Sequence, residues 1–231
     1  MKRMGLLLMV AAWLAVVAVG MSAADSYQVG EKWIYRHEGS RPWTDPDVPV
    51  KGDRIVTIVS SEGEEADRLW VMKQQWGEEG EPTGMYFNRE KQIVKLASAE
   101  RSILYTPPMP MDFSILKTGE EKTFESRIAA PGNVNPATLR LEVKRLPDET
   151  LQVPAGEFTD CCHVQFKTSI IFTQDNQITT AFYRQEMWTN PKVNGIVKEI
   201  YTFDPVNAGG RMIKGYQSVS ELKSYTPPEK K

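Results

Sequence analysis

The sequence predicts an all-β fold, a single curved antiparallel sheet in which strands follow one another in chain order and form a half-barrel or open barrel. Short apolar and β-branched segments alternate with turns rich in Gly, Pro, Asn and Asp, which is typical of antiparallel β domains. Apolar and polar residues also alternate within segments, most clearly at 139–145 (LRLEVKR). Period-two alternation places one set of side chains on a core and the other in water.

The first 24 residues have the composition of a secretory leader. Lys2 and Arg3 precede an uncharged apolar run over 6–19, and small residues end at Ala24. We predict a signal peptide over 1–24 and a mature protein that is periplasmic or secreted. Asp25 follows the leader where a lipoprotein would carry a cysteine, which disfavours acyl anchoring.

Charge and hydropathy restrict the partners of the mature chain. The formal net charge moves from -2 to -4 on leader removal, because the leader carries two basic residues and no acid. This balance argues against binding nucleic acid through broad electrostatic attraction. No later apolar run is long enough for a membrane helix, so we expect a chain that does not span the membrane once the leader is removed.

One domain over 25–225 accounts for the remaining strands, with a flexible tail over 226–231. In the first half, strands are predicted at 31–37, 54–60, 68–76, 84–88 and 91–97. The segment 106–112 (TPPMPMD) carries three prolines, which cannot donate hydrogen bonds to a ladder, so it is predicted to cross the sheet as an extended segment.

The second half predicts longer hairpins. Strand 139–145 is followed by a long strand beginning near Thr159, a partner strand at 177–189, and strands at 196–203 and 211–225. In the long strand the even positions are apolar, so Cys162 is expected to be buried and Cys161 exposed beside His163. A disulfide between these adjacent cysteines would strain the backbone and is disfavoured.

Three motifs carry a resemblance. They are YQVGEKWIY at 27–35, VPAGEF at 153–158 and EMWTNPKVNGIVKEI at 186–200. Together they resemble exported bacterial proteins of unknown function, similar in architecture to periplasmic lipoprotein carriers and their half-barrel relatives. The resemblance implies a concave apolar face that holds acyl chains, and it implies no catalytic residue. The motifs mark turns in which Gly156 and Gly195 can supply positive φ.

Candidates for chemistry are few. Cys161 and His163 could bind a soft metal together with Met109 and Met111, but two or three ligands on a surface are more often incidental. Cysteine catalysis would need a base and an oxyanion hole, of which only His163 is indicated. Acidic pairs such as Glu120-Glu121 lie in predicted turns, where solvated carboxylates are the simpler interpretation. We therefore expect that the protein binds no cofactor and no metal, and that it is not an enzyme.

The aromatic residues offer a sharper hypothesis. In an open curved sheet they could line a groove for an apolar ligand, although burial in a filled core is their commonest fate. The groove candidates are Trp70, Met72, Trp76, Tyr86 and Phe113.

Three classes of function remain open. The leading one is non-catalytic binding of a lipid, an acyl chain or an envelope partner in the concave face. The second is a structural or interaction module of the cell envelope that pairs through an exposed sheet edge. The third, a hydrolase, has the least support.

Overall fold

The chain forms a closed antiparallel β-barrel. The computed structural model describes residues 27–39, 50–64, 67–77, 82–98, 102–130, 136–174, 177–208 and 211–229. The predicted leader, the loop at 40–49 and the turn at 175–176 lie outside these described residues. No helix of the described residues is long and apolar enough to cross a membrane.

Fifteen strands make up the described structure. Their bounds are β1 (Lys32–Gly39), β2 (Val50–Glu62), β3 (Leu69–Trp76), β4 (Thr83–Phe87), β5 (Gln92–Ala97), β6 (Ser102–Pro110), β7 (Glu121–Ala129), β8 (Ala137–Arg145), β9 (Glu149–Val153), β10 (Gly156–Gln174), β11 (Gln177–Asn190), β12 (Gly195–Phe203), β13 (Val206–Ala208), β14 (Arg211–Ile213) and β15 (Tyr216–Thr226). A short 3₁₀ turn, η2 (Pro191–Val193), joins β11 to β12.

The predicted open half-barrel is wrong, because the sheet closes. The order runs β11-β12-β15-β1-β2-β3-β4-β5-β6-β7-β8-β10, and β10 pairs again with β11. Twelve strands therefore form a ring, while β9 pairs with the first part of β10 and β13 pairs with β14 in a separate small sheet. The prediction of an antiparallel sheet with mostly sequential neighbours is confirmed. Closure removes the free edges that an open sheet leaves.

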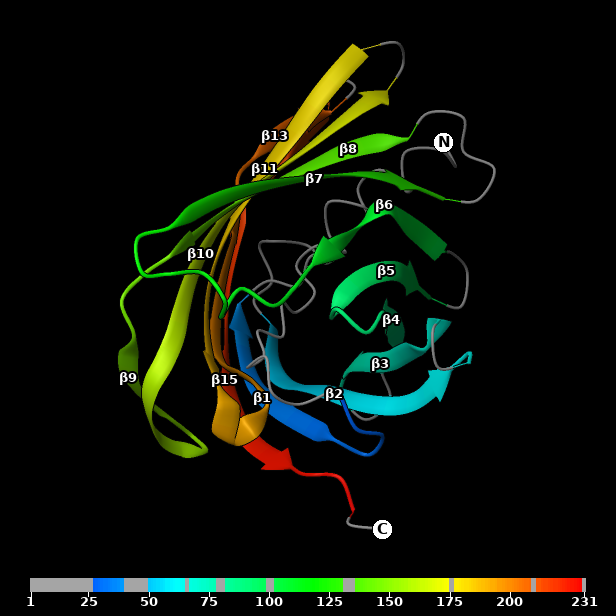
Figure 1. The fold of residues 1–231 in the computed structure, drawn as a ribbon. Coiled ribbons are helices and arrows are strands. Elements are labelled where there is room, and N and C mark those ends of the chain that lie inside the picture. The colour runs from blue at the N-terminus through cyan, green and yellow to red at the C-terminus, as the bar shows by residue number, and fades with distance from the viewer. Residues whose placement is uncertain are drawn as a thin grey trace.

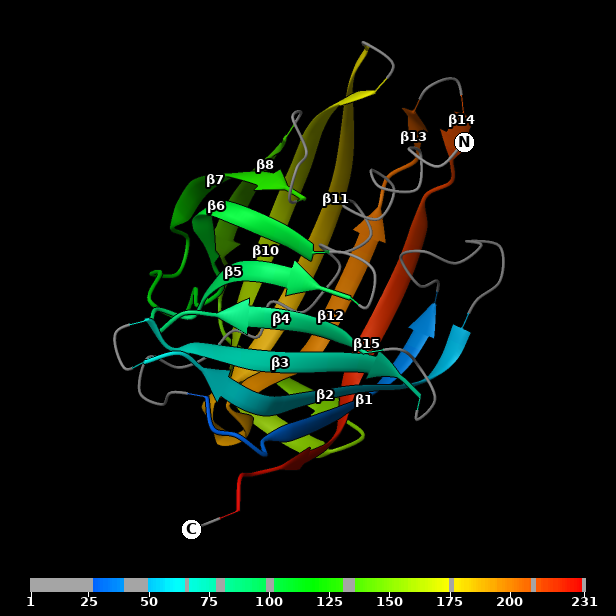
Figure 2. The ribbon, with the colours of Figure 1, turned by 90° about the vertical axis from the view of Figure 1, so that its right-hand side faces the viewer.

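The two walls of the barrel cross each other. In Figure 2, strands β3 to β6 run across the front, and the longer β10, β11, β12 and β15 run upright behind them. Figure 1 shows the same walls facing each other, with β9 outside the ring beside β10. The space between the walls is filled by inward side chains.

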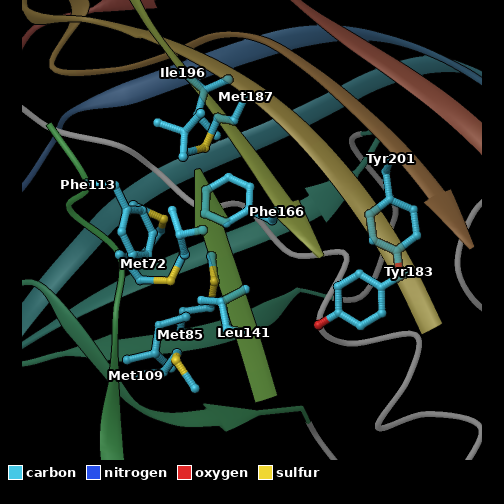
Figure 3. Close-up of a cluster of buried hydrophobic side chains, with 14 of the residues drawn as sticks. Met72, Met85, Met109, Phe113, Leu141, Phe166, Tyr183, Met187, Ile196 and Tyr201 are labelled. Atoms are coloured by element: carbon cyan, nitrogen blue, oxygen red, sulfur yellow. The ribbon is translucent and has the colours of Figure 1, made fainter. Parts of the chain in front are cut away.

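The core is rich in methionine. Figure 3 shows Met72, Met85 and Met109 from one wall packed near Phe166 and Met187 from the other. The side chains of Met72, Met85 and Met187 have no exposed surface. Methionine is unbranched and fills irregular spaces, so this core can adjust its shape more easily than one of branched residues.

The proline-rich segment belongs to a strand, which corrects the prediction for 106–112. Residues up to Pro110 continue β6, where Met109 pairs with Ile93 of β5. Pairing of β6 with β7 stops at Thr106, where the prolines begin. The missing proline N–H groups thus end one ladder and do not break the strand.

Candidate functional site

The three sequence motifs meet at one end of the barrel, which we call the Asn194 end. The indole Nε1 of Trp33 donates to the carbonyl of Val193 at 2.7 Å. The Oε1 atom of the buried Glu31 accepts from the Asn194 amide at 2.8 Å and from the Tyr225 hydroxyl at 3.0 Å. The turn between β11 and β12 is therefore fixed against the start of β1.

The VPAGEF motif at 153–158 is also held at the Asn194 end. Asn190, at the end of β11, donates to the carbonyl of Thr159 at 2.8 Å. The backbone N–H of Ala155 donates to the carbonyl of Leu222 in β15 at 2.9 Å. The β9–β10 hairpin thus crosses to β15, and all three motifs act in closing this end.

The glycines of these motifs have different roles. Gly156 has φ +124, as predicted for a turn glycine. At the other turn the left-handed position is taken by Asn194, with φ 46, and not by Gly195. Gly195 is required for another reason, because a Cβ built there would lie 2.7 Å from Nε1 of Trp33.

A polar cluster lies inside the barrel, away from the Asn194 end. It consists of Tyr35, His37, Arg54, Gln74, Gln185, Glu199 and Ser220, and we call it the interior polar cluster. These residues are all buried. They come from β1, β2, β3, β11, β12 and β15, so the cluster exists only in the closed ring.

An ion pair is the centre of the cluster. The Arg54 Nη1 atom lies 2.7 Å from Glu199 Oε2, with both side chains at most 3% exposed. Gln185 donates to Glu199 Oε1 at 2.6 Å. The Arg54 guanidinium also lies 4.6 Å from the ring centroid of Tyr35. Burial raises the pKa of Tyr35 well above its usual value, so its hydroxyl stays protonated.

His37 joins the cluster to the wall of β15 and β3. Its Nδ1 atom lies 3.0 Å from the Ser220 hydroxyl, and its ring meets that of Trp76 edge to face at 4.5 Å. Its pairing partner in β2 is Gly52, which shares the inward face with Arg54. Gly52 is exposed, and a Cβ built there would meet no described atom within 4 Å.

Several polar atoms of the cluster have no hydrogen-bond partner. They are Nε and Nη2 of Arg54, Oε1 of Gln74 and the Tyr35 hydroxyl. Each is buried, and burial of such a group without a partner costs about 1–3 kcal/mol. Groups of this kind in a folded protein mark a place where water or a ligand completes the hydrogen bonds.

The five predicted groove residues do not form one surface. Met72 and Phe113 are buried in the core, where Phe113 meets the ring of Phe166 at 5.2 Å. Trp70 is partly buried against the core, and Trp76 lies partly buried beside His37. Tyr86 is on the outer face of β4, where Lys95 Nζ lies 4.4 Å from its ring centroid. Of the five, Trp76 contacts the interior polar cluster, through the ring of His37.

The predicted exposure of the cysteines is wrong. Cys161 has no exposed surface and Cys162 is only partly buried. The alternation of faces does hold from Val164 to Phe172. The register between β10 and β11 is also unbroken from Cys162 onward, so the faces do not change at the cysteines. Cys161 is buried by its neighbours: β10 bulges between Phe158 and Cys161, with Asp160 at φ 55, the Cys161 thiol donates to the carbonyl of Phe158 at 3.4 Å, and the Asn190 amide lies 3.6 Å from its sulfur.

His163 is also buried, although it lies on the outer face. Its ring stacks on Trp188 at 4.2 Å, and its Nδ1 atom lies 3.1 Å from Glu149 Oε1. The other oxygen of Glu149 accepts from the Trp188 indole at 3.0 Å. Glu186 lies on the other side, 3.3 Å from His163 Nε2. These contacts hold β9 against β10 and β11.

Other candidates for chemistry stay apart. Met109 is inside the barrel, whereas His163 is held on its outer face by Glu149 and Trp188. Among the described residues, no group of three His, Cys, Asp or Glu side chains could hold a metal ion. Of the acidic pairs, Glu120 bonds to the backbone of Lys117 and Glu121 to Lys144, and these bonds lower the pKa of both carboxyls.

Arg54, Gln74 and Glu199 were not predicted as functional residues from the sequence. One signal was present at Glu199, which shares its parity with Val197, Tyr201 and Phe203 in a segment of alternating pattern. A single acid on an apolar face indicates a buried charge that needs a partner. Nothing in the sequence indicated that the partner is Arg54, which lies far away in the chain.

Comparison of the chain with known proteins found similar solved structures but no family. No family model matches it, and no curated protein does. Solved structures similar to the chain include the following three.

The first is a protein of Bacteroides fragilis, predicted to be exported, with a YmcC-like fold. It is 14% identical to this chain, the match covers 90% of this chain and 100% of that chain, and the TM-score is 0.49. The second is a predicted lipoprotein of Parabacteroides distasonis. It is 13% identical to this chain, the match covers 86% of this chain and 96% of that chain, and the TM-score is 0.40. The third is the hypothetical lipoprotein YmcC of Escherichia coli. It is 12% identical to this chain, the match covers 86% of this chain and 85% of that chain, and the TM-score is 0.42. At these identities a likeness concerns the fold alone, and residue roles have to be derived from this chain.

Proposed function

We propose that this protein is an exported, non-catalytic binding protein that holds an apolar chain of a lipid or acyl ligand inside its barrel, in the periplasm or outside the cell. The observation that carries the proposal is the set of buried, unpartnered polar atoms at Tyr35, Arg54 and Gln74 beside a methionine-rich core. Polar groups that orient a ligand within a mostly apolar interior are the usual composition of a small-molecule site.

The methionines supply the apolar part of such a site. An acyl chain would enter between side chains such as Met72, Met85 and Met187, which pack in the interior. Unbranched thioether side chains change rotamers at low cost, so they can move aside and pack on a bound chain.

The ligand would enter from the end opposite Asn194. The Asn194 end is closed by Trp33, the η2 turn and the β9–β10 hairpin. At the opposite end, β1 finishes at Gly39 and the inward face of β2 carries Gly52, which is exposed and where a Cβ would meet no atom of the described residues within 4 Å. We call this the Gly39 end.

The charged residues in the cluster favour binding over catalysis. Glu199, the carboxylate of the cluster, already accepts from Gln185 and pairs with Arg54. Both oxygens of this carboxylate are therefore already engaged by neighbouring side chains, and neither is left to act on a reacting group.

Native mass spectrometry of protein purified from its own envelope tests the proposal directly. We expect a retained lipid or acyl species, and we expect a fluorescent fatty-acid probe to bind the delipidated protein. Trp76→Ala should weaken probe binding, whereas Tyr86→Ala on the outer face should not. Absence of a retained ligand together with absence of probe binding would contradict the proposal.

A second candidate is an interaction module, and one observation favours it. Ile171, Ile178 and Phe182 are exposed side chains on the outer face of the β10–β11 hairpin. The edge-pairing form of this candidate is weakened, because the ring leaves only β9 and the small β13–β14 sheet with unpaired edges among the described strands. A photo-crosslinker at position 182 should capture one envelope protein, and Ile178→Lys should abolish that product. Capture unaffected by Ile178→Lys would argue against this candidate.

A further inference from the structure

The unpartnered atoms of the interior polar cluster lie on three neighbouring strands. Tyr35 of β1 pairs directly with Arg54 of β2, and Gln74 of β3 pairs with Val56, the next inward residue of β2. Side chains directly or diagonally opposite on one face of a sheet lie within about 5 to 8 Å at their Cβ atoms. The three side chains therefore form one continuous polar wall.

This wall offers both donors and an acceptor. Arg54 pairs with Glu199 through Nη1, while Nε and Nη2 have no partner. Nε and Nη2 lie on one edge of the guanidinium group, so they can donate to two acceptor atoms together. Gln74 Oε1 has no donor, and the Tyr35 hydroxyl can either donate or accept. A matching head group needs acceptors for Arg54 and a donor for Gln74.

The charge of the wall is already balanced. Arg54 and Glu199 compensate each other inside the barrel, where both side chains are at most 3% exposed. A carboxylate or phosphate bound to Arg54 would add a charge without a counter-ion and would also repel Glu199. His37, which also faces the cluster, has its Nδ1 atom 3.0 Å from the Ser220 hydroxyl.

The wall is reached from the Gly39 end. Gly52 shares the inward face with Arg54 two residues further along β2, and it pairs with His37. A Cβ at Gly52 would meet no described atom within 4 Å, so among the described residues this is the position at which we place the entry of a polar head group.

We infer that Tyr35, Arg54 and Gln74 form a head-group site for an uncharged lipid that carries both hydrogen-bond acceptors and a donor, such as the glyceryl ester of a monoacylglycerol. The inference rests on the proposed function, since the apolar chain of the same lipid would lie among the methionines. It adds that the site selects against free fatty acids.

Competition between matched lipids tests the inference. At about pH 8, 1-palmitoylglycerol and palmitate share one acyl chain and differ in the charge of the head group. We expect palmitoylglycerol to displace a bound fluorescent fatty-acid probe at a concentration at least about tenfold lower than palmitate, a difference of about 1.4 kcal/mol. If palmitate competes equally well or better, the inference is overturned while the proposed function stands. If the probe does not bind and native mass spectrometry finds neither lipid bound to the protein, the proposed function fails as well.

Two variants locate the effect. Gln74→Leu removes a buried acceptor without a partner, so it should fold, and it should reduce the preference for palmitoylglycerol over palmitate. Gly52→Trp should weaken binding of both lipids by narrowing the opening, whereas Lys51→Trp, which places the same bulk on the outer face, should not. Thermal melts of each variant establish that it is folded. If Gln74→Leu keeps the wild-type preference and Gly52→Trp binds as wild type does, the cluster holds only buried water and the inference is overturned.

Discussion

The Arg54 guanidinium and the Glu199 carboxylate lie 2.7 Å apart inside the barrel and connect β2 to β12 across the intervening β15 and β1. The two residues belong to opposite ends of the chain, so the pair forms only when the ring closes. Its desolvation is expensive, and the attraction between the charges offsets that cost only while both partners are present.

Removing one partner of this pair should destabilise the protein strongly. Glu199→Leu leaves Arg54 as a buried unpaired charge, and we expect the free energy of unfolding to fall by about 3–5 kcal/mol in urea titrations. The double variant Arg54→Met with Glu199→Leu should recover most of this loss. A double variant as unstable as the single one would show that packing, and not the uncompensated charge, causes the effect.

Adding one methyl group at Gly195 should also destabilise the protein. The new Cβ would lie 2.7 Å from Nε1 of Trp33, whose indole is fully buried and bonded to Val193. We expect Gly195→Ala to lower the unfolding free energy by about 1–3 kcal/mol through overpacking. Gly52→Ala is the matched control in a strand with open space, and it should change stability by less than about 1 kcal/mol.

Thiol labelling should distinguish the two cysteines. Burial raises the pKa of both thiols, and Cys161 has no exposed surface whereas Cys162 is partly buried. In the native protein we expect slow maleimide labelling that Cys162→Ser abolishes and Cys161→Ser preserves. Both thiols should react rapidly in denaturant. Faster native labelling at Cys161 would mean that the β9–β10 hairpin opens.

Alkaline pH should unfold the protein through its buried tyrosines. Burial raises the pKa of Tyr27, Tyr183 and Tyr201 well above the ordinary value of 10.0. The folded state therefore keeps these groups protonated after the unfolded state has ionised. Their contribution to stability is complete below about pH 10 and decreases above it, by about 1.4 kcal/mol per pH unit for each tyrosine.

Urea titrations at about pH 9 and 11 measure this decrease, and tyrosinate absorbance follows the ionisation. The absorbance of these residues should rise together with unfolding. A rise in the native protein, before any loss of structure, would contradict the burial of these hydroxyls.

Local sequence patterns predicted much of the strand content. The alternation at 139–145 corresponds to β8, and the expected strands at 177–189 and 196–203 correspond closely to β11 and β12. Strands and turns are set by the alternation of side chains and by turn residues that are close in sequence, so both can be predicted from the sequence. Faces were predicted less well where a bulge or a covering strand intervenes, as at Cys161 and His163.

The functional residues were harder to predict. The aromatic groove candidates were chosen by residue type, and Tyr86 and Phe113 proved to lie on opposite sides of the wall. Arg54 and Gln74 lie in segments that the sequence predicts as strands, with no feature that indicates a functional residue. Their importance comes from buried polar atoms that have no hydrogen-bond partner in the closed ring, Nε and Nη2 of Arg54 and Oε1 of Gln74, which is a property of the surroundings and not of the segment.

The sequence by itself determined the class of fold, the order of the strands and the turns at Gly156 and Asn190 to Gly195, because these depend on backbone preferences and local alternation. The tertiary structure decided that the sheet closes, since β10 must pair with β8 and with β11, and β15 with β1. An open and a closed sheet show the same alternation in sequence. Only the long-range register brings Arg54 to Glu199 and turns the concave face into a filled interior with a buried polar cluster.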